Sequence, residues 1–227
     1  WDNNWQTQHR LAKELSKNYR VLYIENTGLR SVKIGDFPRI LQRLKNWKRS
    51  ISGFRKINDN LTILSPLIFP FPYIKIFQIL NSLMINKLLN YWIKKNNFNQ
   101  INLISFLATP LVRVTMNKFN FLVSFYYIGD NHLIAAKNQK FVISEEEISK
   151  NVDAVFSTSE KLKEKFIKIN SLTYKFPAGV ELEKFQIEEK DTDIPEKLKN
   201  IPKPVIGFIG SLNEKIDLEL MDHVLKS

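Results

Sequence analysis

The sequence has 227 residues, of which 44% are hydrophobic, so it is long enough to bury a core and too apolar to be disordered. It has no cysteine, which excludes disulfides, zinc–thiolate sites and thiol nucleophiles and suits a reducing cytoplasm. The formal net charge is +11, and the stretch from Arg30 to Lys56 supplies +8 of it, with nine basic residues against one acid. Such a local excess points to an anionic partner near one surface.

The ends and the apolar stretches of the chain also limit its class. The chain begins at Trp1, and no charged-then-apolar signal segment follows, so we interpret the start as a cut end. The most apolar stretches, residues 60–74 and 96–112, are broken by prolines and polar residues. No membrane span is therefore predicted.

Short β-branched and aromatic runs alternate with amphipathic segments up to residue 176. The runs that predict strands are 20–25, 61–64, 101–106, 121–127, 153–156 and 172–176. The segments that predict helices are 5–17, 74–92, one opened by Thr109 and Pro110, a short one with Ser144 and Glu147 as a capping box, and one from Ser157 and Glu160 to about Ile169. In 74–92 the helical spacing is carried by Ile76, Ile79, Leu80, Leu83, Met84, Leu88 and Trp92. This alternation favours a parallel sheet with helices on both faces, which is a Rossmann-like α/β fold.

The composition changes after Phe185. Residues 186–203 are highly charged and have little periodicity, so we interpret them as a linker. Residues 204–210 predict a new buried strand that ends in glycine, and a helix follows over 216–225. We therefore expect a first Rossmann-like domain over 1–185 that lacks its first strand, and the truncated start of a second one over 204–227.

Two groups of polar residues lie where an open parallel sheet carries its functional groups, near the carboxyl ends of strands. Asp130 and His132 follow the strand at 121–127, where a carboxylate and an imidazole suit proton transfer. Ordinary turn chemistry with His132 as a helix cap is the alternative. Gln8 and His9 stand at the start of the first helix, where they suit binding of sugar hydroxyls or an oxyanion, or form a solvated face.

The order of several short motifs resembles the GT-B glycosyltransferases of the family-4 type, particularly bacterial capsule, teichuronic-acid and exopolysaccharide transferases. The motifs are Gln8-His9-x-Leu11-Ala12-x-x-Leu15, Arg20-Val-Leu-Tyr23, Tyr126-x-x-x-Asp130, Asp153-x-Val155-x-x-Thr158-Ser159, Pro177-x-Gly179-Val180-x-x-x-x-Phe185 and Ile206-Gly-Phe-Ile-Gly-Ser211. Ala178 and Glu181 depart from the asparagine and aspartate usual in the family, and Val152 stands where alanine is usual.

The resemblance implies an enzyme that moves a sugar from a nucleotide-diphosphate sugar to a polysaccharide or lipid-linked acceptor, without a cofactor. The first domain would bind the acceptor through Gln8 and His9, with Asp130 and His132 as catalytic groups. Gly210, Ser211 and Lys215 would hold the donor diphosphate at the start of the second domain. The family's paired glutamates lie beyond this chain, so we expect the chain to be inactive alone. The implied location is cytoplasmic, with attachment to the inner face of the plasma membrane as a further hypothesis.

That hypothesis comes from the basic segment between Pro38 and Gly53. Apolar residues recur there at helical spacing, and arginines and lysines fill the positions between them. An interfacial helix on an anionic membrane has this pattern, with Trp47, Ile51 and Arg43 as contacts. A helix that packs on the core and exposes a basic face to solvent has the same pattern of residues. Two other functions also fit the charge or the departures from the motif: a basic nucleic-acid-binding module, and a non-catalytic transferase-like scaffold.

Overall fold

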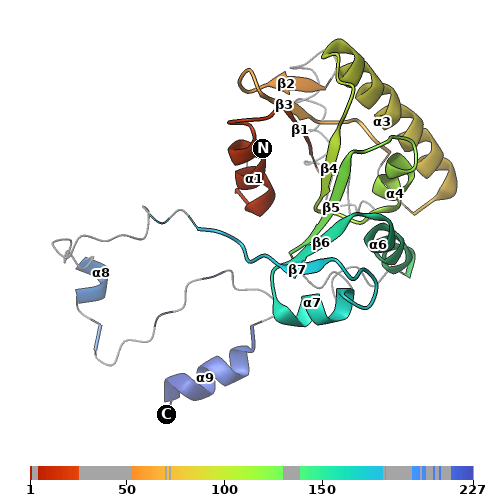
Figure 1. Cartoon of the computed structure of the whole chain (residues 1–227). Helices are drawn as coiled ribbons and strands as arrows, with labels where there is room; N and C mark the ends of the chain where they lie inside the picture. Colours follow the sequence, from red (N-terminus) through yellow and green to blue (C-terminus); the bar gives the residue numbers. More distant parts are fainter. Residues whose placement is uncertain are drawn as a thin grey trace. The chain divides into compact units, whose positions relative to one another are not determined.

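The computed structural model describes residues 1, 5–25, 53–69, 71, 73–129, 139–180, 182, 196–199, 201–202, 207, 210 and 216–226. The chain divides into two compact units, Trp1–Gly179 and Val180–Ser227. The first unit contains both sheets described below (Figure 1). None of the described helices combines the length and the apolarity that crossing a membrane requires.

A three-stranded sheet begins the first unit. Strand β1 (Val21–Ile24) pairs in parallel with β3 (Leu61–Leu64), so that Val21 lies opposite Leu61 and Ile24 opposite Leu64. Both strands confirm the sequence prediction. Strand β2 (Phe54–Lys56) pairs antiparallel with the other edge of β3 and was not predicted, since Phe54 fits the helical spacing of the basic segment. The residues of that segment before Gly53 lie outside the described residues.

A second sheet of four parallel strands confirms the Rossmann-like α/β prediction. Its order is β4 (Asn102–Ser105), β5 (Val123–Ile128), β6 (Ala154–Ser157) and β7 (Thr173–Lys175). Helices α4 (Pro110–Met116), α6 (Gln139–Asn151) and α7 (Glu160–Phe166) connect these strands. All three pack on the same face of the sheet, where the largest buried side chains are Tyr126, Phe141 and Phe166. Their apolar side chains form the main core of the unit.

Two predicted helix starts were wrong. Ser144 is not a cap, because α6 already begins at Gln139; its hydroxyl instead donates to the Lys140 carbonyl 2.9 Å away, one turn back. Ser157 is the last residue of β6, and Ser159 caps α7 by accepting from the Leu162 amide at 3.4 Å. The predicted start of α4 is confirmed, since Thr109 caps it and Pro110 is its first residue. Caps are local features, and a shift of a few residues is enough to misplace them.

The long helix α3 (Lys75–Lys95) confirms the predicted helix at 74–92, but its apolar residues are distributed unexpectedly. It packs beside α4 and, through Ile85, Leu88 and Leu89, against the three-stranded sheet. Its buried residues include the polar Asn81 and Ser82. The predicted stripe is largely exposed, at Ile76, Ile79, Leu80, Leu83 and Met84.

In the second unit the structure describes two helices, α8 (Glu196–Lys199) and α9 (Leu218–Lys226). Helix α9 agrees with the predicted helix at 216–225, and the Asp217 carboxylate accepts from the Leu220 amide at 2.9 Å at its start. Helix α8 falls inside the predicted linker. Most of the predicted strand at 204–210 lies outside the described residues.

Candidate functional site

The start of α1 (Thr7–Leu15) and the end of β1 lie at the same edge of the first sheet. A turn of a few residues joins the helix to the strand, so the two run in opposite directions. Nine helical residues span about 14 Å and four extended residues about 13 Å, so the two elements have matching lengths. His9 near the helix start therefore meets Tyr23 near the strand end. The distance from His9 Nε2 to the Tyr23 hydroxyl is 3.2 Å.

The hydrogen bonds of His9 determine which of its ring nitrogens carries the proton. The Gln6 backbone N–H donates to His9 Nδ1 at 3.1 Å, so Nδ1 acts as the acceptor. In the neutral ring Nε2 then carries the hydrogen and donates it to Tyr23. Because the tyrosine oxygen is the acceptor in that bond, its own hydrogen remains oriented away from His9, where it can donate to another group.

A carboxylate and a hydroxyl follow the same two parallel strands. Glu25 comes directly after β1 and Ser65 directly after β3. The Ser65 hydroxyl donates to one Glu25 carboxylate oxygen at 2.6 Å, and the amino group of Trp1 contacts the other at 2.6 Å. We call His9, Tyr23, Glu25 and Ser65 the carboxyl-edge cluster. Its members come from α1 and from the ends of β1 and β3, and β3 is distant in sequence from the other two elements.

Burial and neighbouring charges set the ionisation of this cluster. Burial lowers the pKa of His9. Burial and the nearby Glu25 raise the pKa of Tyr23 to about 12. Burial would raise the pKa of Glu25, but hydrogen bonds, among them the one from Ser65, bring it below its usual value. At neutral pH the cluster therefore holds a neutral imidazole, a neutral phenol and a carboxylate.

Aromatic rings line one side of the cluster. The Trp1 ring lies 5.1 Å from Trp5, 5.6 Å from His9 and 5.4 Å from Tyr23, measured between centroids. Trp5 is 39% exposed. Flat apolar rings beside a few fixed polar groups are typical of small-molecule sites.

The structure brings only some of the predicted site residues together. His9 belongs to the carboxyl-edge cluster, whereas the Gln8 side chain donates to the Gln6 side chain at 2.6 Å. Gly210 is exposed in the second unit. The other predicted residues lie outside the described residues: Asp130, His132, Ser211, Lys215, Arg43, Trp47 and Ile51.

Gly129, the described neighbour of Asp130, lies just beyond the end of β5. Its carbonyl accepts a hydrogen bond from the Thr158 hydroxyl at 2.9 Å, and the Thr158 amide donates to the Ile128 carbonyl at 3.2 Å. The chain that leads to Asp130 is thereby tied to the carboxyl end of β6.

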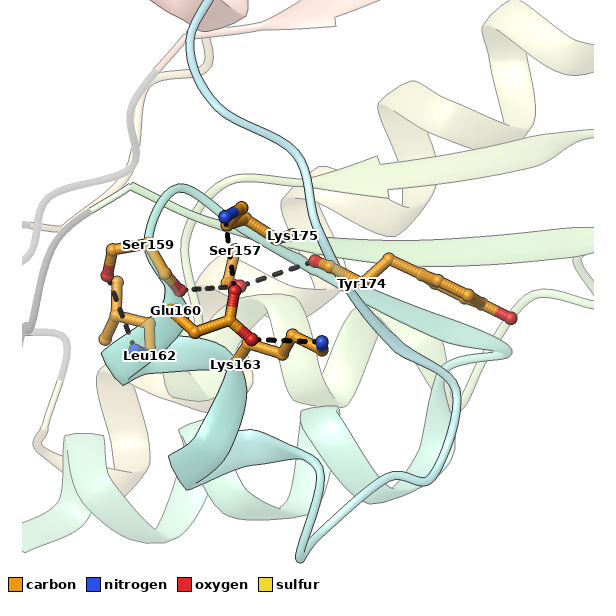
Figure 2. A network of polar contacts seen from close by, with 7 residues as sticks. All are labelled: Ser157, Ser159, Glu160, Leu162, Lys163, Tyr174 and Lys175. Atoms are coloured by element: carbon orange, nitrogen blue, oxygen red, sulfur yellow. Dashed lines mark hydrogen bonds and ion pairs between the residues drawn. The ribbon is translucent and has the colours of Figure 1, made fainter.

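Figure 2 shows a second polar network at the ends of β6 and β7. The Ser157 hydroxyl contacts the carbonyls of Ser159 and Tyr174, both at 3.3 Å. The Glu160 carboxylate contacts Lys163 at 3.0 Å and Lys175 at 3.2 Å, and these lysines lower its pKa. These groups satisfy one another, so the network holds the start of α7 to the sheet.

Sequence reasoning missed Tyr23, Glu25 and Ser65 as site residues. The available signal was their position, since each lies at or just past the carboxyl end of a predicted parallel strand. Among the described residues, no three His, Cys, Asp or Glu side chains gather as metal ligands. In comparisons with known proteins, no family model and no curated sequence matches this chain.

Proposed function

We propose that this chain is the acceptor-binding half of a glycosyltransferase, which moves a sugar from a nucleotide-diphosphate sugar to a cell-surface polysaccharide or lipid-linked acceptor. The observation that supports it best is the carboxyl-edge cluster, in which polar groups meet at the ends of parallel strands of a Rossmann-like unit. The order of the sequence motifs supports it independently.

The ionisation of the cluster suits a neutral, hydroxyl-rich ligand. The Tyr23 hydroxyl has a hydrogen to donate, and Glu25 accepts hydrogen bonds from sugar hydroxyls. A carboxylate there repels phosphate, so the cluster favours the acceptor over the donor diphosphate. The rings of Trp1 and Trp5 offer flat apolar surfaces to a sugar ring.

The catalytic and donor-binding roles remain proposals on residues outside the described part. Asp130 follows Gly129, whose carbonyl is tied to the end of β6, so we assign proton transfer to Asp130 and His132. Gly210, Ser211 and Lys215 would hold the donor diphosphate. In an enzyme with both halves, Asp130→Asn is expected to lower turnover at least about tenfold, and full turnover would remove this residue from catalysis.

The acceptor role is tested on the 227-residue chain by saturation-transfer NMR with a panel of neutral oligosaccharides. We expect binding of at least one of them, weakened about fivefold by Tyr23→Phe because one hydrogen bond is lost. Tyr174→Phe is the matched control, since Tyr174 is 50% exposed and lies outside the cluster. No oligosaccharide binding, or an equal effect of both variants, would contradict the proposal.

A further inference from the structure

Helix α3 presents a continuous apolar surface to solvent. Ile76, Ile79, Leu80, Leu83 and Met84 follow one another at helical spacing, and Leu83 is 64% exposed. The opposite side of the helix holds the buried Asn81, Ser82 and Ile85. Large aliphatic side chains thus lie on the outer side of α3 although polar ones lie inside. A contiguous exposed patch of this kind marks an interaction surface.

Two phenylalanines extend this surface at the start of the helix. Phe69 is 42% and Phe71 37% exposed, and both rings pack against Phe77, with centroids 5.2 and 5.1 Å away. The buried Asn81 fixes the backbone of Phe69, because its side chain accepts from the Phe69 amide at 2.7 Å and donates to the Phe69 carbonyl at 3.0 Å. The Phe69 ring is therefore held in place by a pair of hydrogen bonds to its backbone, and the Phe71 ring by its contact with Phe77.

The charge of the helix itself has one sign. Helix α3 contains four lysines and no acidic residue. In the sequence from Asn60 to Gly129 there are six basic residues and no aspartate or glutamate, a net charge of +6. Along the outer side of α3, the apolar residues of the first turns give way to Lys87, Tyr91, Lys94 and Lys95, all exposed.

We propose that this surface, the exposed side of α3 with Phe69 and Phe71, lies on an anionic lipid membrane. We call it the α3 surface. Its apolar first half, about 15 Å long, would insert among the lipids at the level of the headgroups. Its lysines would meet lipid phosphates, and Tyr91 would lie at the boundary between them. The lack of acidic residues on α3 argues for a negatively charged lipid surface over an ordinary protein partner.

This inference stands on the described residues and does not depend on the glycosyltransferase proposal. It also names a different surface from the segment with Arg43, Trp47 and Ile51. A protein that binds membranes through α3 without binding any sugar acceptor would keep the inference and refute the proposed function. A protein that binds a sugar acceptor but does not bind membranes through α3 would keep the proposed function and refute the inference.

The first test is cosedimentation of the 227-residue chain with vesicles of phosphatidylcholine containing about one third phosphatidylglycerol. The double variant Ile79→Ser with Leu83→Ser is expected to lower the partition coefficient at least about tenfold, because two aliphatic side chains no longer enter the membrane. The matched control is Ile143→Ser with Leu172→Ser, which removes two similarly exposed aliphatic side chains from other elements. Equal partitioning of the two double variants overturns the proposal.

The charge contribution is tested with Lys87→Gln and Lys94→Gln together, and with pure phosphatidylcholine vesicles. Binding is expected to weaken about fivefold or more in the double lysine variant, and also for the unchanged chain on pure phosphatidylcholine vesicles. Raising the salt concentration is expected to weaken binding to the anionic vesicles as well. Lys161→Gln with Lys168→Gln is the control, since both lysines are exposed outside α3. Equal binding to anionic and to pure phosphatidylcholine vesicles contradicts the proposal.

A site-specific probe separates insertion from folding effects. The chain has no cysteine, so Leu83→Cys and Ile143→Cys each accept a single polarity-sensitive fluorophore. The probe at position 83 is expected to shift to the blue on anionic vesicles, and the probe at position 143 is not. If sedimentation velocity instead shows a dimer that the Ile79→Ser, Leu83→Ser variant abolishes, the α3 surface binds a second copy and the proposal is wrong.

Discussion

The hydrogen bond between Tyr126 and Glu145 offers the sharpest test of how the first unit is held together. Tyr126 is fully buried in β5, and its hydroxyl donates at 2.9 Å to the Glu145 carboxylate of α6, which is 3% exposed. Lys165 of α7 lies 3.8 Å from the other carboxylate oxygen. The bond therefore connects the sheet to two of the helices that cover it. Tyr126→Phe keeps the ring and removes only the donor.

The expected cost follows from what remains after the substitution. One buried oxygen of Glu145 would lose its hydrogen-bond donor, and a bond to a charged group is worth more than one between neutral groups. We expect the free energy of unfolding to fall by about 2–3 kcal/mol. For a chain of this size the melting temperature would fall by roughly 4–12 °C.

The neighbouring tyrosine provides the control. The Tyr127 hydroxyl donates to the Phe176 carbonyl at 3.2 Å, and Phe176 is 54% exposed, so water can replace that bond. Tyr127→Phe is expected to cost less than about 1 kcal/mol. Urea unfolding followed by circular dichroism measures both variants. If they lose the same amount of stability, the buried carboxylate does not depend on Tyr126 and the reasoning is refuted.

The remaining predictions concern three single residues. The ring of His9 is expected to carry its proton on Nε2 and to titrate below pH 6.5, because burial disfavours its charged form; nitrogen-detected NMR would show Nδ1–H instead if the assignment is wrong. Because the pKa of His9 is lowered in the folded state, the free energy of unfolding that His9 contributes is present above pH 6.5 and is lost as pH falls through the folded pKa. His9→Asn should therefore reduce the loss of stability at acid pH in a series of urea-unfolding measurements. Gly53→Ala should cost about 1–2 kcal/mol, because Gly53 has φ +76° and an added Cβ would lie 3.0 Å from the Ser65 carbonyl oxygen; an unchanged urea midpoint would argue against this backbone conformation. Ser149→Ala should be neutral or stabilise by up to about 1 kcal/mol in thermal melts, because no described group bonds its buried hydroxyl, and a clear loss would reveal a partner.

Local patterns in the sequence were sufficient to predict most of the elements and the class of the fold. The strands at 21–24 and 123–128 are short apolar runs, and the helix at 75–95 has apolar residues at spacings of three and four, so each is determined by its own residues. The alternation of these elements then predicted the parallel sheet. Strand β2 was not predicted, because a run of three residues is too short to show a period and the spacing of the apolar residues before it favoured a helix.

The candidate site was predicted only in part. His9 was identified from its place at a helix start, but its partners Tyr23, Glu25 and Ser65 lie up to 56 positions away in sequence. They meet because β1 and β3 pair in parallel and in register, which no local pattern specifies. The direction of the hydrogen bond from the Gln6 amide, and with it the tautomer of His9, also depends on the folded backbone.

Helix α3 shows most clearly what the sequence determines and what the tertiary structure determines. Its sequence alone specifies a long helix with large apolar residues on more than one side and without any acidic residue. Which side of that helix faces the protein was decided by tertiary packing, because Ile85, Leu88 and Leu89 fit against the sheet and Asn81 bonds the Phe69 backbone. The spacing of apolar residues in the sequence predicts the helix. Only the shape and the hydrogen-bonding needs of the neighbouring elements determine which face of the helix is buried.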